Sequence, residues 1–243
     1  MWIDVGATAI LIGYYLLLCL LIPVAMRRWL GISPEVVRKT QHMAYAFSIF
    51  IQLQLFTTWY WSLASAFVLV ILGYPALKLL EKGPQYRRYL VDRSARGGEL
   101  RRQLLYVQFS FALLIFLFWG LFGPEFRYLA AAAVMTWGFG DAAAALVGRY
   151  LGRRNFSHRL IERAKTVEGT RAMMVAAFAA MFLTLLIYGG KPWFVSLAVA
   201  LLVAPVAGLA ELFSKRGTDT LTVPVSAAAA ALPLILLFSA LGW

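Results

Sequence analysis

Asp141 lies in a run of small and apolar residues that otherwise has the composition of a membrane-spanning helix. A charged carboxylate near the centre of a bilayer costs about 2.5–3.5 kcal/mol, so such acids are usually retained for a function. Carboxylate oxygens are also the ligands that a hard divalent cation such as Mg²⁺ prefers. Asp141 is therefore the first candidate for a functional residue. A paired structural charge on a helix-packing face is the alternative.

A stripe of small residues continues from this acid along one helical face. Steps of four, three and four residues lead from Asp141 to Ala145, Gly148 and Gly152. Such a face lets either a neighbouring helix or a ligand come close. Small residues at this spacing in membrane helices most often serve packing, so both readings stay open.

A second polar block precedes the next apolar run. It contains Lys165, Thr166, Glu168 and Gly169, and Arg149 follows the glycine stripe. Acids that hold a divalent cation, together with Lys and Arg that neutralise phosphate charge, suit the binding of a polyphosphate. The two blocks together predict a nucleotide site at one face of the membrane.

These blocks resemble the cytidine-nucleotide signature of the dolichol kinase and phytol kinase family. The matching residues are Gly140-Asp141, Gly148-Arg149, Gly152 and Lys165-Thr166-Val167-Glu168-Gly169. Phosphatidate cytidylyltransferases are similar in this part. Near the C-terminus, Glu211 and Asp219-Thr220-Leu221-Thr222-Val223-Pro224 resemble the family's Glu and Asp-Asn-Leu-Thr-Val-Pro, with Thr220 in place of Asn. More weakly, Arg38-Lys39-x-x-His42 resembles an early motif of the family.

The resemblance implies a CTP-dependent kinase of a membrane lipid alcohol, with Mg²⁺ as the metal. The implied catalytic residues are Asp141, Lys165 and Asp219. The implied nucleotide-binding residues are Gly140, Gly148, Arg149, Gly152, Lys165, Thr166, Glu168 and Gly169. The implied metal ligands are Asp141, Glu168, Glu211 and Asp219. Since neither histidine is well placed as a general base, Asp219 or Asp141 would accept the alcohol proton. For Asp219, capping of the last helix is the alternative role.

Two other classes of function are weighed against the kinase. A phosphatidate cytidylyltransferase needs a similar site, but the Gly-His-Gly-Gly and Asp-Arg-x-Asp-Ser patterns usual in that family are absent. A membrane transporter would also accommodate an intramembrane acid, yet it gives no reason for Lys-Thr-x-Glu-Gly in a link. The G-x-x-x-x-G-K-[ST] pattern is absent as well, which argues against a P-loop ATP enzyme.

Composition defines the fold class. The 243 residues are 62% hydrophobic and 14% charged, which excludes a soluble globular domain and predicts an all-α, polytopic integral membrane protein. The formal charge of +12 does not indicate nucleic acid, because no basic soluble domain carries it. One cysteine, Cys19, and two histidines cannot form a Cys/His zinc cluster. Oligomeric state is left open.

About eight transmembrane helices are expected within a single domain, residues 1–243. The first two cover Ala7 to Met26 and His42 to Thr57, the third ends near Leu80, the fourth covers Leu104 to Phe122, the fifth contains Asp141, the sixth covers Ala172 to Gly189, the seventh ends at Glu211 and the eighth covers Leu221 to Leu241. Cytoplasmic links are expected near 27–41, 81–103, 149–171 and 213–220. The polar face of the second helix indicates either hydrogen bonds between helices or contact with a cavity or substrate.

The distribution of Lys and Arg sets the expected orientation. Of 23 such residues, 21 fall in the alternate links assigned to the cytoplasm when Lys78, just before the second of them, is included, and only Arg127 and Lys191 fall in the others. The positive-inside rule then places both termini outside and the active site towards the cytoplasm. Within the fifth helix, Gly138 and Gly140 allow a local break near Asp141, and an unbroken helix is the alternative.

Overall fold

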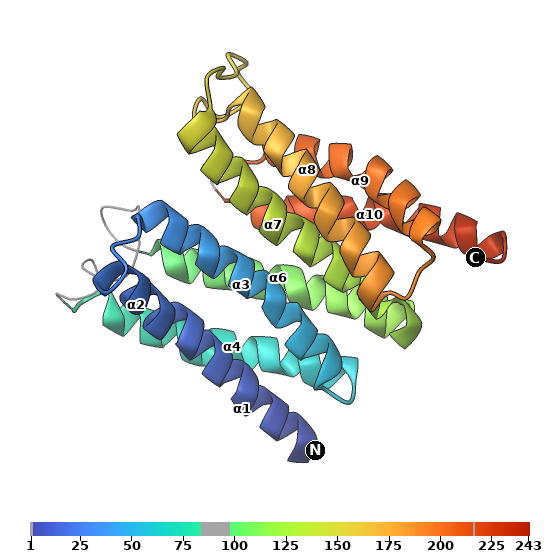
Figure 1. Ribbon diagram of the computed structural model, residues 1–243. Helices are drawn as coiled ribbons and strands as arrows, with labels where there is room; N and C mark the ends of the chain where they lie inside the picture. The colour runs from blue at the N-terminus through green and yellow to red at the C-terminus, as the bar shows by residue number, and fades with distance from the viewer. Residues whose placement is uncertain (1, 84–97, 216) are drawn as a thin grey trace. The chain divides into compact units, whose positions relative to one another are not determined.

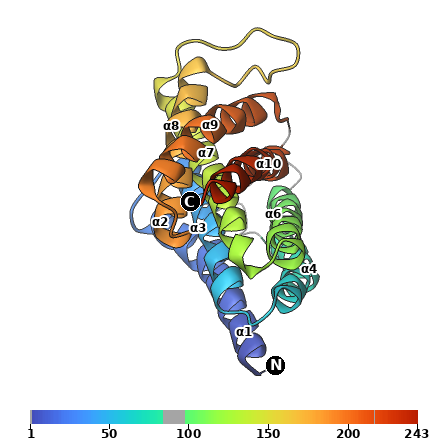
Figure 2. The same ribbon diagram turned by 90° about the vertical axis from the view of Figure 1, so that its right-hand side faces the viewer.

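The computed structural model describes residues 2–83, 98–215 and 217–243, and it divides the chain into two compact units, Met1–Phe116 and Leu117–Trp243 (Figures 1 and 2). Regular structure in the described residues is helical, and the only β pairing there is an isolated bridge between Asn155 and Thr166. The predicted all-α class is thereby confirmed. The single domain over 1–243 stays a prediction.

Among the described residues, six helices are long and apolar enough to cross a membrane, as expected of a multi-pass membrane protein. They are α4 (Trp59–Leu80), α6 with a π-helical end (Glu99–Leu121), α7 with a preceding 3₁₀ turn (Pro124–Leu151), α8 with a π-helical end (Val167–Tyr188), α9 (Trp193–Phe213) and α10 (Asp219–Ala240). The count of eight stays a prediction.

The first unit contains α1 (Trp2–Leu16), α2 (Ile22–Arg28), α3 (Pro34–Gln54), α4 and α6 (Glu99–Ile115). A π-helical segment, Leu17–Leu21, joins α1 to α2, so the expected first span is one continuous helical stretch. Helix α3 packs against α1 and α2, and α6 lies along α4.

Helix α3 begins at Pro34, so the expected link 27–41 is shorter than the sequence analysis assumed. Proline suits the first turn of a helix because its missing N–H would have no partner there. One turn later Arg38 and Glu35 form an ion pair of 2.6 Å, which supports the helix start. The expected link 81–103 is shorter too, because α4 ends at Leu80 and α6 begins at Glu99. Most of it, including Pro84, Ser94 and Gly97, lies outside the described residues.

The polar face of α3 is used for hydrogen bonds between helices. Gln41 donates to the backbone carbonyl of Leu18 at 3.2 Å. The hydroxyl of Tyr15 on α1 lies 3.0 Å from that of Ser48 and accepts from Gln108 of α6 at 2.7 Å. These bonds tie α1, α3 and α6 together. Of the two readings for this face, interhelical hydrogen bonding accounts for Gln41 and Ser48.

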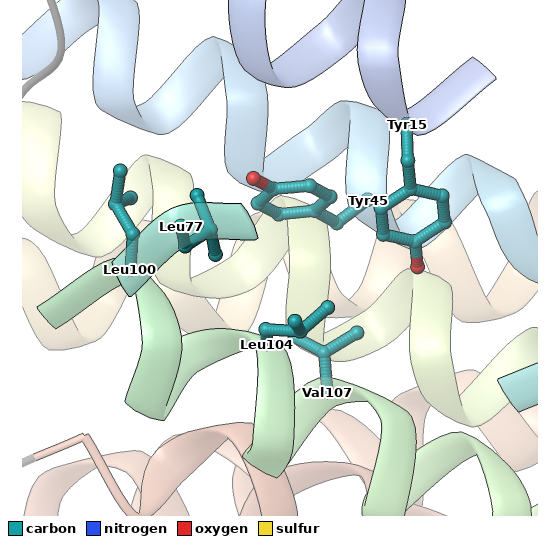
Figure 3. Close-up of a pocket in the computed structure, with 6 residues that line it drawn as sticks. All are labelled: Tyr15, Tyr45, Leu77, Leu100, Leu104 and Val107. Atoms are coloured by element: carbon teal, nitrogen blue, oxygen red, sulfur yellow. The ribbon is translucent and has the colours of Figure 1, made fainter. Parts of the chain in front are cut away.

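A small apolar cavity lies beside this hydrogen-bonded group. Figure 3 shows the rings of Tyr15 and Tyr45 on one side and Leu104 and Val107 of α6 on another, with Leu77 and Leu100 beyond them. The cavity volume is about 20 Å³, which is room for about one water molecule. It is too small to hold a nucleotide or a lipid chain.

The second unit is built from α7 (Arg127–Leu151), α8 (Val167–Leu183), α9 and α10. Helix α7 packs against α8 and α10, and α9 packs against the same two helices. Helix α7 runs unbroken through Gly138 and Gly140, so the unbroken alternative is the correct one. The expected links 149–171 and 213–220 shorten to 152–166 and 214–218, because the flanking helices extend further than expected.

Candidate active site

Asp141 and Asp219 come together in the second unit. Asp141 lies within α7 and is 9% exposed, and Asp219 is the first residue of α10. A carboxylate oxygen of one lies within 4.8 Å of a carboxylate oxygen of the other. The two helices pack together, which brings these acids close although they are far apart in the sequence. Two oxygen donors at this separation, on separate helices, fit a hard cation such as Mg²⁺.

Glu211 is the third acid of this group. It lies in the last turn of α9 and is 8% exposed. The charges of Asp141 and Asp219 both act on its carboxylate, so the three acids share one environment.

The short turn 214–218 sets the distance between Glu211 and Asp219. Ser214 hydrogen-bonds to the hydroxyl of Thr222, and the Thr218 hydroxyl donates to the carbonyl of Lys215 at 2.9 Å. Gly217 has a φ of +84°, a left-handed conformation that glycine adopts without strain. Thr218, not Asp219, occupies the N-cap position of α10, and the Asp219 carboxylate lies beside that of Asp141.

Lys165 brings a positive charge to the three acids. Its ammonium group lies 2.9 Å from Oε1 of Glu211 and also donates a hydrogen bond to the Glu211 backbone carbonyl. The two side chains are 14% and 11% exposed. In a setting this poorly hydrated, each charge needs the other, because leaving either one unpaired would be strongly destabilising.

The link 152–166 fixes the backbone of Lys165 from both sides. Asn155 and Thr166 form an antiparallel bridge, and the amide of Phe156 donates to the Lys165 carbonyl at 3.2 Å. The hydroxyl of Thr166 caps α8 by accepting from the amide of Gly169 at 3.0 Å. Because of this cap, α8 begins at Val167 and not near Ala172 as expected.

The glycines of the sequence motif lie where α7 and α8 approach closely. A Cβ atom on Gly169 would lie 2.8 Å from the backbone oxygen of Ala144, and one on Gly148 would lie 3.0 Å from the Thr166 hydroxyl. A Cβ atom on Gly152 would meet the backbone oxygen of Gly148 in the preceding turn and would lie 2.7 Å from the Thr166 methyl group. Helix packing therefore accounts for these glycines. Their contact with a nucleotide stays a prediction.

Gly140 lies at the same contact between α7 and α8, further from the link. A Cβ atom there would lie 2.8 Å from the terminal methyl group of Met173.

Glu168 and Arg149 lie towards the link. Glu168 accepts hydrogen bonds from the backbone amides of Arg153 and Arg154 at 3.1 and 3.3 Å. Arg149 is exposed near the end of α7. The bonds of Glu168 hold the start of the link against α8. Its role as a metal ligand, and that of Arg149 in nucleotide binding, stay predictions.

In the first unit, the weakly matching early motif forms local contacts. Arg38 pairs with Glu35, and Nδ1 of His42 lies 3.1 Å from the amide nitrogen of Gln103.

The sequence reasoning missed the pairing of Lys165 with Glu211. These residues are 46 positions apart, and no periodicity connects a link with the end of a later helix. The available signal was physical, because charged residues near a membrane interior pair with one another.

Comparison with known proteins gives one clear relative. The chain is 31% identical over 234 residues to a phytol kinase of Synechocystis sp. (strain ATCC 27184 / PCC 6803 / Kazusa), an alignment that covers 94% of this chain and 90% of the relative. No family profile matches the chain, and no solved structure matches it significantly. The similarity extends over nearly the whole length of both proteins, so the chain belongs to the phytol and polyprenol kinase family.

Proposed function

We propose that this protein transfers the γ-phosphoryl group of CTP to the hydroxyl of a membrane lipid alcohol of the phytol or polyprenol class. The observation that carries the proposal is the closeness of Asp141 and Asp219, within 4.8 Å, beside the Lys165–Glu211 pair. The relative's name supports a lipid-alcohol acceptor. The resemblance of the central block to the cytidine-nucleotide signature supports CTP.

Mg²⁺ is the proposed metal, and Asp141 and Asp219 are its proposed ligands. Their oxygens come from two helices and suit a hard cation that keeps part of its shell for water and phosphate oxygens. When bound, Mg²⁺ would neutralise charge on the transferring phosphoryl group. Glu211 and Glu168, also expected as ligands, hold Lys165 and the link in this structure.

Lys165 is proposed to stabilise the phosphates. Glu211 keeps the ammonium group close to the two aspartates. Phosphate oxygens of a bound nucleotide would compete with the Glu211 carboxylate for this ammonium group. Glu211 is then a positioning residue that delivers Lys165 to the site.

The chemical step needs a proton acceptor. The alcohol oxygen forms a bond to the γ-phosphorus, the bond from that phosphorus to the bridging oxygen of CDP breaks, and the alcohol proton passes to a carboxylate. Asp219 and Asp141 are the two candidates. The distribution of Lys and Arg supports a cytoplasmic location for these groups, where nucleotides are available.

The position of the transferred label tests the proposal. Purified protein receives a lipid extract, Mg²⁺ and CTP labelled at either the α or the γ phosphate, with γ-labelled ATP in parallel. We expect only the γ label of CTP to enter the organic phase, with release of CDP. Entry of the α label with release of pyrophosphate would instead establish a cytidylyltransferase. No transfer from either nucleotide, across lipid alcohols and phosphatidate, would favour a transporter.

A further inference from the structure

The link 152–166, called here the arginine hairpin, presents a strongly basic surface. Its exposed cationic residues are Arg153, Arg154, Arg159 and Arg163, and Glu162 is the one acid in this range. The fifth cation of the hairpin, Lys165, already pairs with Glu211. Figures 1 and 2 show the link projecting beyond the ends of α7 and α8, with its tip away from the helices of its unit.

The arginine hairpin connects two candidate membrane spans, so its two ends are expected near the bilayer surface. It follows Leu151 of α7 and precedes Val167 of α8, both of which belong to candidate membrane spans. Apolar side chains accompany its charges, since Leu151, the residue before the hairpin, is 65% exposed and Leu160 within it is 54% exposed. Basic and large apolar residues combined in this way are typical of segments that rest in the headgroup region.

The hairpin has a defined shape. The side-chain amide of Asn155 donates to the carbonyl of Arg163 at 3.0 Å, across the two arms. The amide of Val167 donates to the Arg154 carbonyl at 2.9 Å. A preorganised surface loses less conformational entropy on binding than a disordered one.

One arm of the hairpin leads directly into the candidate active site. The amide of Phe156 bonds to the carbonyl of Lys165, whose ammonium group pairs with Glu211. The position of the hairpin and the position of Lys165 are therefore mechanically connected.

We propose that the arginine hairpin docks on anionic phospholipid headgroups and that this docking holds Lys165 in its active position. The guanidinium groups match phosphate in charge and geometry. A lipid headgroup is the ligand, and not free phosphate, because the exposed leucines gain only from a bilayer. The docking is independent of the reaction, whereas its effect on turnover rests on the proposed function.

The binding test uses bilayer nanodiscs of phosphatidylcholine with increasing phosphatidylglycerol. A fluorophore sensitive to polarity is attached at Ser157→Cys in a Cys19→Ala background, and Arg159→Gln/Arg163→Gln is compared with the matched control Arg27→Gln/Arg28→Gln. We expect a blue shift as phosphatidylglycerol rises. The hairpin variant should need over tenfold more of this lipid, since each arginine near the surface contributes roughly fivefold. The control variant should behave as the parent.

The same samples test the effect on turnover. Phosphatidylglycerol should raise phosphoryl transfer several-fold in the parent and the control but not in the hairpin variant, whose activity in pure phosphatidylcholine should match that of the parent. An unchanged blue shift in the hairpin variant, or an equal loss in the control, would overturn the docking. So would a blue shift produced by inorganic phosphate in pure phosphatidylcholine. A normal blue shift without any phosphoryl transfer would leave the docking established and refute the proposed function alone.

Discussion

Lys165 and Glu211 form an ion pair of 2.9 Å although 46 residues separate them in the chain. The pair joins the link before α8 to the last turn of α9, next to Asp141 and Asp219. The carboxylates of Asp141, Asp219 and Glu211 thus lie in one environment with the Lys165 ammonium group. Carboxylate oxygens gathered in this way favour binding of a divalent cation before or together with the anionic nucleotide.

Glu211→Gln should separate the positioning of Lys165 from its charge. The amide keeps the shape of the side chain but cannot form an ion pair, so Lys165 keeps only hydrogen bonds to residue 211 and its position is held less strongly. We expect kcat to fall by about 10- to 100-fold, the range seen when supporting groups are removed, with a smaller change in the KM for the nucleotide. Steady-state kinetics in detergent or nanodiscs measure both constants. An unchanged kcat would contradict the positioning role.

Asp141→Asn and Asp219→Asn should each remove one metal-binding charge with little change in shape. We expect each to lower phosphoryl transfer by about a hundredfold to a thousandfold, while the protein stays folded and inserted. Because both acids would serve one metal, the double variant should lose much less than the product of the single losses. Near-normal activity of either variant at saturating Mg²⁺ would remove that residue from the site. Loss of folded protein would favour a structural charge.

Gly169→Ala should destabilise the second unit, because its methyl group would meet the backbone oxygen of Ala144 at 2.8 Å. Overpacking of this kind costs about 1–3 kcal/mol in the free energy of unfolding. The closest contacts of Gly140→Ala are with the sulfur and terminal methyl group of Met173, a flexible side chain that can shift more easily than backbone, so this substitution should cost less. Gly13→Ala on α1 is the matched control, since no other atom lies within 4 Å of the new methyl group. Denaturant unfolding in detergent measures the loss in the free energy of unfolding for each variant. Equal losses for Gly169→Ala and Gly13→Ala would contradict the expected order.

Two substitutions at Glu168 distinguish a link anchor from a metal ligand. Its carboxylate accepts from the amides of Arg153 and Arg154, and the oxygen of a glutamine can accept similar bonds. If Glu168 acts through the link, Glu168→Gln should keep most of the activity and Glu168→Ala should lose more. Activity measured over a range of Mg²⁺ concentrations decides between the roles. A strong loss in Glu168→Gln that excess Mg²⁺ restores would establish a metal ligand.

Single cysteines in a Cys19-free variant test the orientation. Ser157 on the arginine hairpin and Glu125 in the link before α7 are both exposed. We expect Glu125→Cys to react with an impermeant thiol reagent in intact cells and Ser157→Cys to react only after permeabilisation. Ser214, in the turn before α10, would be a poor reporter because it is 7% exposed and hydrogen-bonded. Labelling of Ser157→Cys from outside would reverse the assigned topology.

Hydropathy and charge predicted the all-α membrane fold, because burial of backbone in a bilayer leaves helices as the main solution. Helix ends were predicted less well. Pro34 and Thr166 start α3 and α8 earlier than the apolar runs suggest, because local capping and not hydropathy sets the first turn. The sequence also singled out Asp141 and Asp219 as separate candidates. Their closeness depends on how α7 packs against α10, which no local pattern encodes.

Glycine positions were identified correctly as sites of close approach, but the sequence could not say what approaches. Gly148 and Gly169 face each other across two helices, and the distance between them is a property of the packed pair. For the same reason, the sequence could not identify the ion-pair partner of Lys165. Several acids satisfied the charge rule, and only the course of α9 selects Glu211.

The positions of these acids in the sequence mean that the candidate site is completed late in synthesis. Asp141 enters the membrane with α7, whereas Glu211 and Asp219 come with the last two helices. Until those helices are inserted, the acids that share the site with Asp141 are absent, and the close approach of Asp141 to Asp219 cannot form. The candidate site is therefore assembled only when the last two helices have entered the membrane.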